Sequence, residues 1–152
     1  MNKDKTLIMG LGNVLLQDEG IGVHVLKELE KQDWPEHVEL LDGGTGGFVL
    51  LSLFQEYRNM IIIDATLNNE PEGSISVIKP RFSSDFPKSL STHDLGLKDM
   101  LESAILLGKI PEITLITVSI NPEQKMNMEL SPALRERISE IIEKVKEEAL
   151  SL

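Results

Sequence analysis

Short apolar runs that suit strands alternate with segments of helical periodicity along this chain. The clearest run is Met60–Ile63, in which four apolar residues, three of them β-branched, lead directly to Asp64. A strand of this composition is typically buried on both faces, as in a parallel sheet. Ile21, Val25 and Leu29 recur at steps of four, the spacing of one helix face. This alternation favours folds in which helices cover a mostly parallel sheet.

The same patterns predict the element order β-α-β-α-β-β-α-β-α. Strands are expected at Thr6–Met9, Val38–Leu41, Met60–Ile63, Ser74–Ile78 and Ile113–Val118. Helices are expected from Ile21 to before Pro35, at Phe48–Tyr57, at Leu95–Leu107, and from Ser131-Pro132 onward, where proline suits the first helical position. The predicted fold is a three-layer α/β sandwich, a mostly parallel twisted sheet of about five strands with helices on both faces. The 152 residues contain no linker or repeat, so one domain spanning residues 1–152 is expected.

Charge and composition exclude several classes of function. The formal net charge of −10 disfavours sequence-independent nucleic-acid binding, which needs Lys and Arg, and binding to anionic membranes. The absence of cysteine excludes thiolate nucleophiles and sulfur ligands supplied by this chain. The apolar runs fall far short of the roughly 20 residues of a membrane span, and no signal peptide is expected. The expected location is the cytoplasm.

In open α/β sheets, ligands bind at the carboxyl ends of the strands. This rule selects the loops Gly10–Gly22, Asp42–Gly47 and Asp64–Thr66, with Ser91–Asp94 as a loop that joins them if it crosses the same edge.

The glycines of Gly10-Leu11-Gly12 invite comparison with a dinucleotide-binding loop. The third glycine of that motif is replaced by Leu15, and no Walker lysine follows. Tight turns and close approach of another chain segment are the favoured interpretation of these glycines.

Each polar candidate in these loops has a structural alternative. Asp18 and Glu19 precede a helix, where acidic residues act as caps; if Asp18 caps alone, Glu19 is available for another role. Asp64 either faces the crevice or accepts backbone hydrogen bonds. His93, beside Asp94, is a ligand, a surface residue or a cap.

Glu19, Asp64 and His93 together offer two carboxylates and one imidazole. This set suits borderline metals such as nickel, zinc, manganese or iron. Three protein ligands would leave coordination positions open for water or substrate. Residues so far apart in sequence meet only through the fold, so spacing alone leaves the site a hypothesis.

The residues in these loops resemble those of a known family, the [NiFe]-hydrogenase maturation endopeptidases, which remove a C-terminal extension from the hydrogenase large subunit. The likeness covers essentially the whole chain, and only Lys79–Ser91 and the C-terminal tail are similar more loosely. The matching stretches are Gly10–Gly22, Asp42–Thr45, Ile63–Ala65 and His93–Leu97.

The resemblance implies roles for particular residues. Glu19, Asp64 and His93 would bind metal, and the Asp42–Thr45 loop would lie near the site. Because the family acts on a nickel-loaded precursor, the nickel would arrive with the substrate. The implied partner is a [NiFe]-hydrogenase large-subunit precursor.

The chemistry open to this chain is that of carboxylates and metal. It has no GxSxG elbow and no HExxH helix, and no base is visibly paired with Thr45, Ser91 or Thr92. A peptidase of aspartic or metal-dependent type is therefore expected. Glu19, Asp64 and Asp42 are its candidate catalytic residues, with Asp42 or Asp64 activating water. The alternative is a non-catalytic maturation chaperone that inspects the metal.

Overall fold

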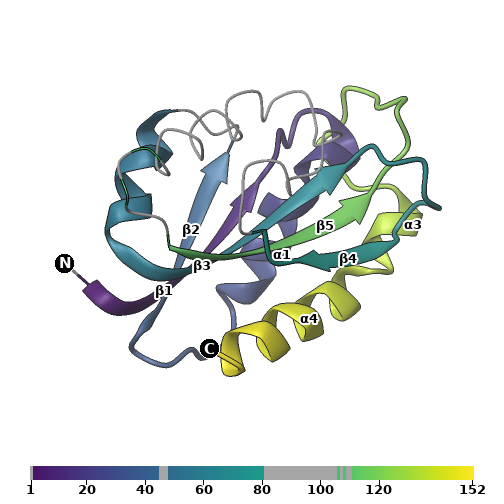
Figure 1. The fold of residues 1–152 in the computed structure, drawn as a ribbon. Coiled ribbons are helices and arrows are strands. Elements are labelled where there is room, and N and C mark those ends of the chain that lie inside the picture. The colour runs from purple at the N-terminus through teal and green to yellow at the C-terminus, as the bar shows by residue number, and fades with distance from the viewer. Residues whose placement is uncertain (1, 45–47, 81–105, 107, 109–110) are drawn as a thin grey trace.

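The centre of the molecule is a sheet of five strands in the order β2-β1-β3-β5-β4 (Figure 1). The computed structural model describes residues 2–44, 48–80, 106, 108 and 111–152. Four strands are parallel, and β4 pairs antiparallel with β5 at one edge. The strands are β1 (Asn2–Leu11), β2 (Val38–Gly44), β3 (Tyr57–Thr66), β4 (Ile75–Ile78) and β5 (Glu112–Ser119). The predicted five-stranded, mostly parallel sheet is confirmed.

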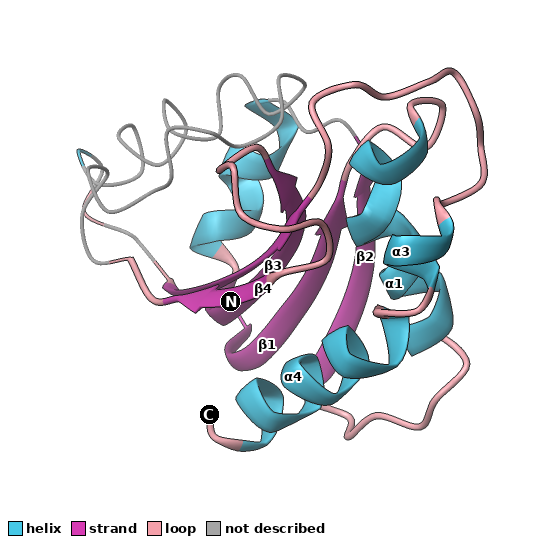
Figure 2. Ribbon diagram, turned by 90° about the vertical axis from the view of Figure 1, so that its right-hand side faces the viewer, coloured by secondary structure: helices cyan, strands magenta, loops and turns pink. Residues whose placement is uncertain are grey.

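Helices lie on both faces of this sheet (Figure 2). One face carries α1 (Ile21–Leu29), the short α3 (Pro132–Arg135) and α4 (Ile138–Leu150). The 3₁₀ helix η2 (Phe48–Gln55) packs on the other face through Phe54. A second short 3₁₀ helix, η1 (Gln17–Gly20), leads directly into α1. Within the described part of the chain, none of the helices is both long and apolar enough to pass through a lipid bilayer.

The central strand β3 divides the core in two by its alternation. Ile61 and Ile63 face α1 and α4, whereas Met60 and Ile62 face η2. All four side chains are fully buried. The continuous apolar run therefore follows from burial on both faces, as its composition indicates.

Several boundaries differ from the sequence prediction. The second helix ends at Gln55 and Tyr57 already belongs to β3, because the strand extends to pair Tyr57 with Asn2 of β1. The last helix is two pieces, α3 and α4, rather than one. Apart from Leu106, which is helical, the predicted helix at Leu95–Leu107 lies outside the described residues.

Tyr57 donates a hydrogen bond to Glu39 of β2, which also binds the Lys5 ammonium group at 2.6 Å. Burial, and then the bond to Glu39, raise the pKa of Tyr57 to about 12. The resulting stabilisation is complete below the ordinary tyrosine pKa of 10.0 and is lost as the pH rises through 12.

Tyr57→Phe is expected to lower the free energy of unfolding by about 1 kcal/mol at neutral pH, because one intramolecular hydrogen bond is lost. The variant should also lose the part of the alkaline destabilisation that falls between pH 10 and 12. Denaturant unfolding across this range measures both effects. Tyr57 is the single tyrosine, so phenolate absorbance follows this group alone; half-ionisation near 10 in the folded protein would contradict the account.

Candidate functional site

The carboxyl ends of the parallel strands meet at one edge of the sheet, and the start of α1 is pressed against it (Figure 1). A Cβ atom on Gly22 of α1 would lie 2.2 Å from the Ile63 carbonyl oxygen and 2.3 Å from that of Leu11. A Cβ atom on Gly10 would lie 2.2 Å from the Gly22 carbonyl oxygen. The close approach of chain segments explains Gly10 and Gly22 without a bound phosphate.

Glu19 lies in η1, which contacts β3 at this edge. The backbone of Glu19 packs closely on Gly12. A Cβ atom at position 12 would lie 2.2 Å from the Glu19 carbonyl oxygen, and the φ of +146° at Gly12 also favours glycine. Glu19 is only 7% exposed. Within the described residues, its carboxylate takes part in no hydrogen bond or ion pair. Because a buried charge without a partner is costly, this carboxylate is a strong candidate for binding a cation.

Asp18, next to Glu19, has a structural role that differs from the predicted one. Its carboxylate accepts hydrogen bonds from the backbone N–H and the hydroxyl of Ser131, at 2.8 and 2.7 Å. No side chain caps α1, so the expected capping by Asp18 is wrong. Asp18 instead ties the start of α1 to the start of α3, which leaves Glu19 available for another role.

The Asp64 side chain is fully buried. The residue lies within β3, because the strand continues to Thr66 and does not end before the acid. Its Oδ1 atom accepts a hydrogen bond from the Ala65 N–H at 2.8 Å. Alternation places its side chain on the η2 face, with Met60 and Ile62. Thr117 of β5 is its neighbour in register and is also buried, so the carboxyl ends of β3 and β5 form a polar region within an apolar core.

Asp42 lies at the same edge of the sheet, opposite Gly10 in register. It is exposed, and its Oδ1 atom accepts a hydrogen bond from the Gly44 N–H at 2.8 Å. Gly44 adopts a φ of +54°, and its carbonyl accepts the Gly12 N–H at 2.7 Å. The predicted Asp42 loop is therefore fastened to the Gly10–Gly12 turn. Since Val38 and Leu40 pack on the α1 side, alternation along β2 places Asp42 on the sheet face opposite Asp64.

Three of the four predicted site residues, Glu19, Asp42 and Asp64, thus gather at one edge of the sheet. His93 lies outside the described residues, as do Thr45, Ser91 and Thr92. Among residues 2–44, 48–80, 106, 108 and 111–152, no group of three His, Asp or Glu side chains is placed to hold a metal ion.

The two other histidines occupy different surroundings. His24 is half-buried in α1, and burial, with Lys27 nearby, lowers its pKa. His37 is exposed and lines a cavity at the opposite edge of the sheet. These positions indicate a structural role for His24 and a surface role for His37.

The carboxylates at this edge are of a type that can bind a divalent metal. Glu19 and Asp64 would supply oxygens, and a third donor would be needed to complete a protein-bound set. His93 is the residue that the sequence resemblance assigns to that position. Local sequence did not reveal that Ser131 bonds to Asp18 or that Thr117 lies beside Asp64. Both contacts join residues that are far apart in the sequence.

Comparison with known proteins gives consistent results. A sequence profile described as hydrogenase maturation protease (HycI) matches residues 23–148. The chain is 34% identical to the hydrogenase 2 maturation protease of Escherichia coli (strain K12) over 145 residues, 93% of this chain and 88% of that protein.

Solved structures agree with the sequence comparison. The hydrogenase maturating endopeptidase HybD from E. coli superposes with a TM-score of 0.84 at 33% identity, covering 93% of this chain and 89% of that one. The [NiFe] hydrogenase maturation protease HybD from Thermococcus kodakarensis superposes with a TM-score of 0.76 at 25% identity, covering 94% and 97%.

Proposed function

Since the chain belongs to the hydrogenase maturation protease family, we propose that it is an endopeptidase that removes the C-terminal extension of a nickel-loaded [NiFe]-hydrogenase large-subunit precursor. Membership of this family supports a peptidase activity, and the similar protein from T. kodakarensis is named a [NiFe] hydrogenase maturation protease. Nickel is part of the substrate in this proposal. Recognition of that metal by two carboxylates and one imidazole is the part that depends on the site.

The main support for the proposal is the environment of the Glu19 carboxylate. Its carboxylate is nearly buried, lies beside the end of β3, and has no hydrogen bond or ion pair within the described residues. The neighbouring Asp18 satisfies the local structural needs through Ser131. The Glu19 carboxylate is therefore suited to bind a cation that arrives with a partner protein, since Asp18 already bonds to Ser131.

In the proposed mechanism, Glu19, Asp64 and His93 hold the substrate's nickel and thereby fix the scissile peptide bond at the sheet edge. The rigid packing of Gly22 on β3 keeps Glu19 in place relative to the strand that carries Asp64. Metal bound there would polarise the scissile carbonyl or lower the pKa of a bound water.

A carboxylate is also needed to accept a proton from the attacking water. Asp64 and Asp42 are the candidates. Asp42 is exposed at the same edge, and only its Oδ1 atom is bonded within the described residues, which leaves Oδ2 for the proton. Alternation along the strands places the two side chains on opposite sheet faces, so one of them would act and the other would not.

The proposal is tested by incubating the protein with nickel-loaded and nickel-free forms of the same precursor and recording intact masses. We expect a shortened product from the nickel-loaded form and full-length chain from the nickel-free form, because the metal fixes the scissile bond. A stable complex with no shortened product would indicate a chaperone that inspects the metal. Equal cleavage of both forms would contradict recognition through nickel.

A further inference from the structure

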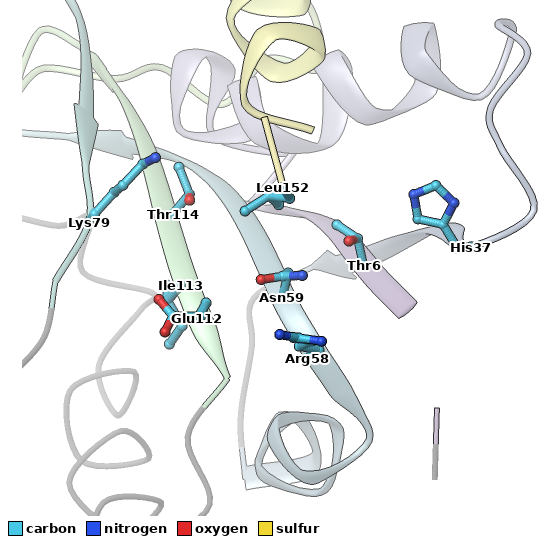
Figure 3. A pocket seen from close by; sticks show the side chains of 9 residues that line it. All are labelled: Thr6, His37, Arg58, Asn59, Lys79, Glu112, Ile113, Thr114 and Leu152. Atoms are coloured by element: carbon cyan, nitrogen blue, oxygen red, sulfur yellow. The ribbon is translucent and has the colours of Figure 1, made fainter. Parts of the chain in front are cut away.

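A cavity of about 470 Å³ opens at the amino-terminal ends of β1, β3 and β5 (Figure 3). This edge of the sheet is opposite the one that carries Glu19 and Asp64. A ligand in the cavity would not occupy the proposed cleavage site, so the two can be tested separately.

The floor of the cavity is formed by polar side chains from three adjacent strands. Thr6, Asn59 and Thr114 come from β1, β3 and β5. Thr6 pairs with Asn59, and Thr114 pairs with Ile61, two residues further along β3. The three side chains share the α4 face of the sheet, because each lies two residues before a core residue of that face, namely Ile8, Ile61 or Ile116. Figure 3 shows Asn59 between the two threonines, with Leu152 from the chain's last residues beside it.

The two threonines are almost fully buried residues whose hydroxyls are available for bonding. Thr6 is 2% exposed and Thr114 is 3% exposed. Within the part of the chain that the structure describes, neither side-chain hydroxyl forms a hydrogen bond with the protein. The two hydroxyl oxygens are not among the fully buried, unpartnered side-chain atoms of the described residues, so both are accessible from the cavity that their residues line. Their bonding capacity is therefore directed into the cavity, toward water or a ligand.

The rim of the cavity is rich in basic side chains. His37, Arg58 and Lys79 stand around it, with Glu112 as the acidic member among the lining residues. Lys79 is exposed and forms an ion pair with Glu148 of α4 at 3.3 Å. In a chain of net charge −10, basic side chains gathered beside two available hydroxyl donors favour an anionic ligand with oxygen acceptors.

We propose that this cavity binds a small oxyanion, a carboxylate or a phosphate group. The hydroxyls of Thr6 and Thr114 donate hydrogen bonds to its oxygens, and Arg58 and Lys79 balance its charge. Asn59 supplies a further amide donor between the two threonines.

The test follows backbone amide signals by NMR while sodium phosphate or sodium acetate is added, with ionic strength held constant by sodium chloride. We expect saturable shifts at Thr6, Asn59 and Thr114 with at least one of the two anions, and the anion that saturates at the lower concentration identifies the ligand class. Signals of Glu19 and Asp64 should stay unchanged.

The double variant Thr6→Val, Thr114→Val keeps the side-chain shape and removes both donors. It should weaken binding by about 10-fold or more, as expected for lost hydrogen bonds to a charged group. Arg58→Gln should weaken binding similarly, whereas Lys31→Gln, an exposed change remote from the cavity, should not. Shifts that do not saturate with either anion, or equal affinity in the valine variant, would overturn the proposal.

Discussion

Asp64→Asn is expected to lower the rate of precursor cleavage by about 100-fold or more, the usual range for loss of a catalytic or metal-holding carboxylate. The change is nearly isosteric, and an asparagine oxygen can still accept the Ala65 N–H bond that Asp64 accepts at 2.8 Å. The loss would therefore reflect charge rather than shape. Single-turnover cleavage of nickel-loaded precursor, followed by mass, gives the rate.

Glu19→Gln provides an independent second variant, because Glu19 reaches the site from η1 rather than from β3. It should lower the rate of precursor cleavage by about 10- to 100-fold, because the nickel is then bound less tightly. Glu28→Gln is the matched control, since Glu28 lies on α1 and pairs only with Lys31 among the ion pairs of the described residues. Thermal unfolding of each variant separates loss of fold from loss of chemistry. Wild-type rates in well-folded Asp64→Asn and Glu19→Gln would contradict the proposed roles.

Gly22→Ala is expected to destabilise the protein by about 3 kcal/mol or more, near the upper end of what overpacking costs. The added Cβ atom would lie 2.2 Å from the Ile63 carbonyl oxygen and 2.3 Å from that of Leu11. Both atoms belong to the backbone of the central strands, so no side-chain rotation can relieve the overlap. For a domain of this size the melting temperature should fall by about 6–12 °C.

The matched control for this change is Lys27→Ala, an exposed position on the same helix. Its effect should stay within about 0.5 kcal/mol, as for most surface substitutions. Denaturant unfolding of both variants measures the difference. A Gly22→Ala protein as stable as the wild type would show that α1 does not sit as closely on β3 as described.

Much of the fold was predictable from local composition. The run Met60–Ile63 is buried on both sides in the structure, and a buried strand of this kind has a distinctive sequence. The extension of β3 through Asp64 to Thr66 was not predicted. It depends on pairing with Thr117 and Ser119 of β5, more than fifty positions away, and local sequence does not encode such pairing.

The candidate site was predictable only in part. The rule that ligands bind at strand ends, together with the family resemblance, selected Glu19, Asp42 and Asp64, and the structure places all three at one edge of the sheet. The role of Asp18 was misjudged, because helix capping is a local rule and the actual partner, Ser131, is far away in sequence. The sequence predicted Thr6 and Thr114 only as strand residues. Their position at one cavity depends on the register of β1, β3 and β5, which local sequence does not specify.

Glu19, Asp64 and His93 are proposed to hold one divalent metal together. A crystal structure of the protein soaked with nickel, with the metal located by its anomalous signal, would show which side chains bind it. We expect one metal bound by all three side chains, with bonds of about 2.0–2.2 Å to the carboxylate oxygens and the imidazole nitrogen. A separation of about 10 Å between the donor atoms of any two of these residues, far beyond what two bonds of that length can span, would contradict it.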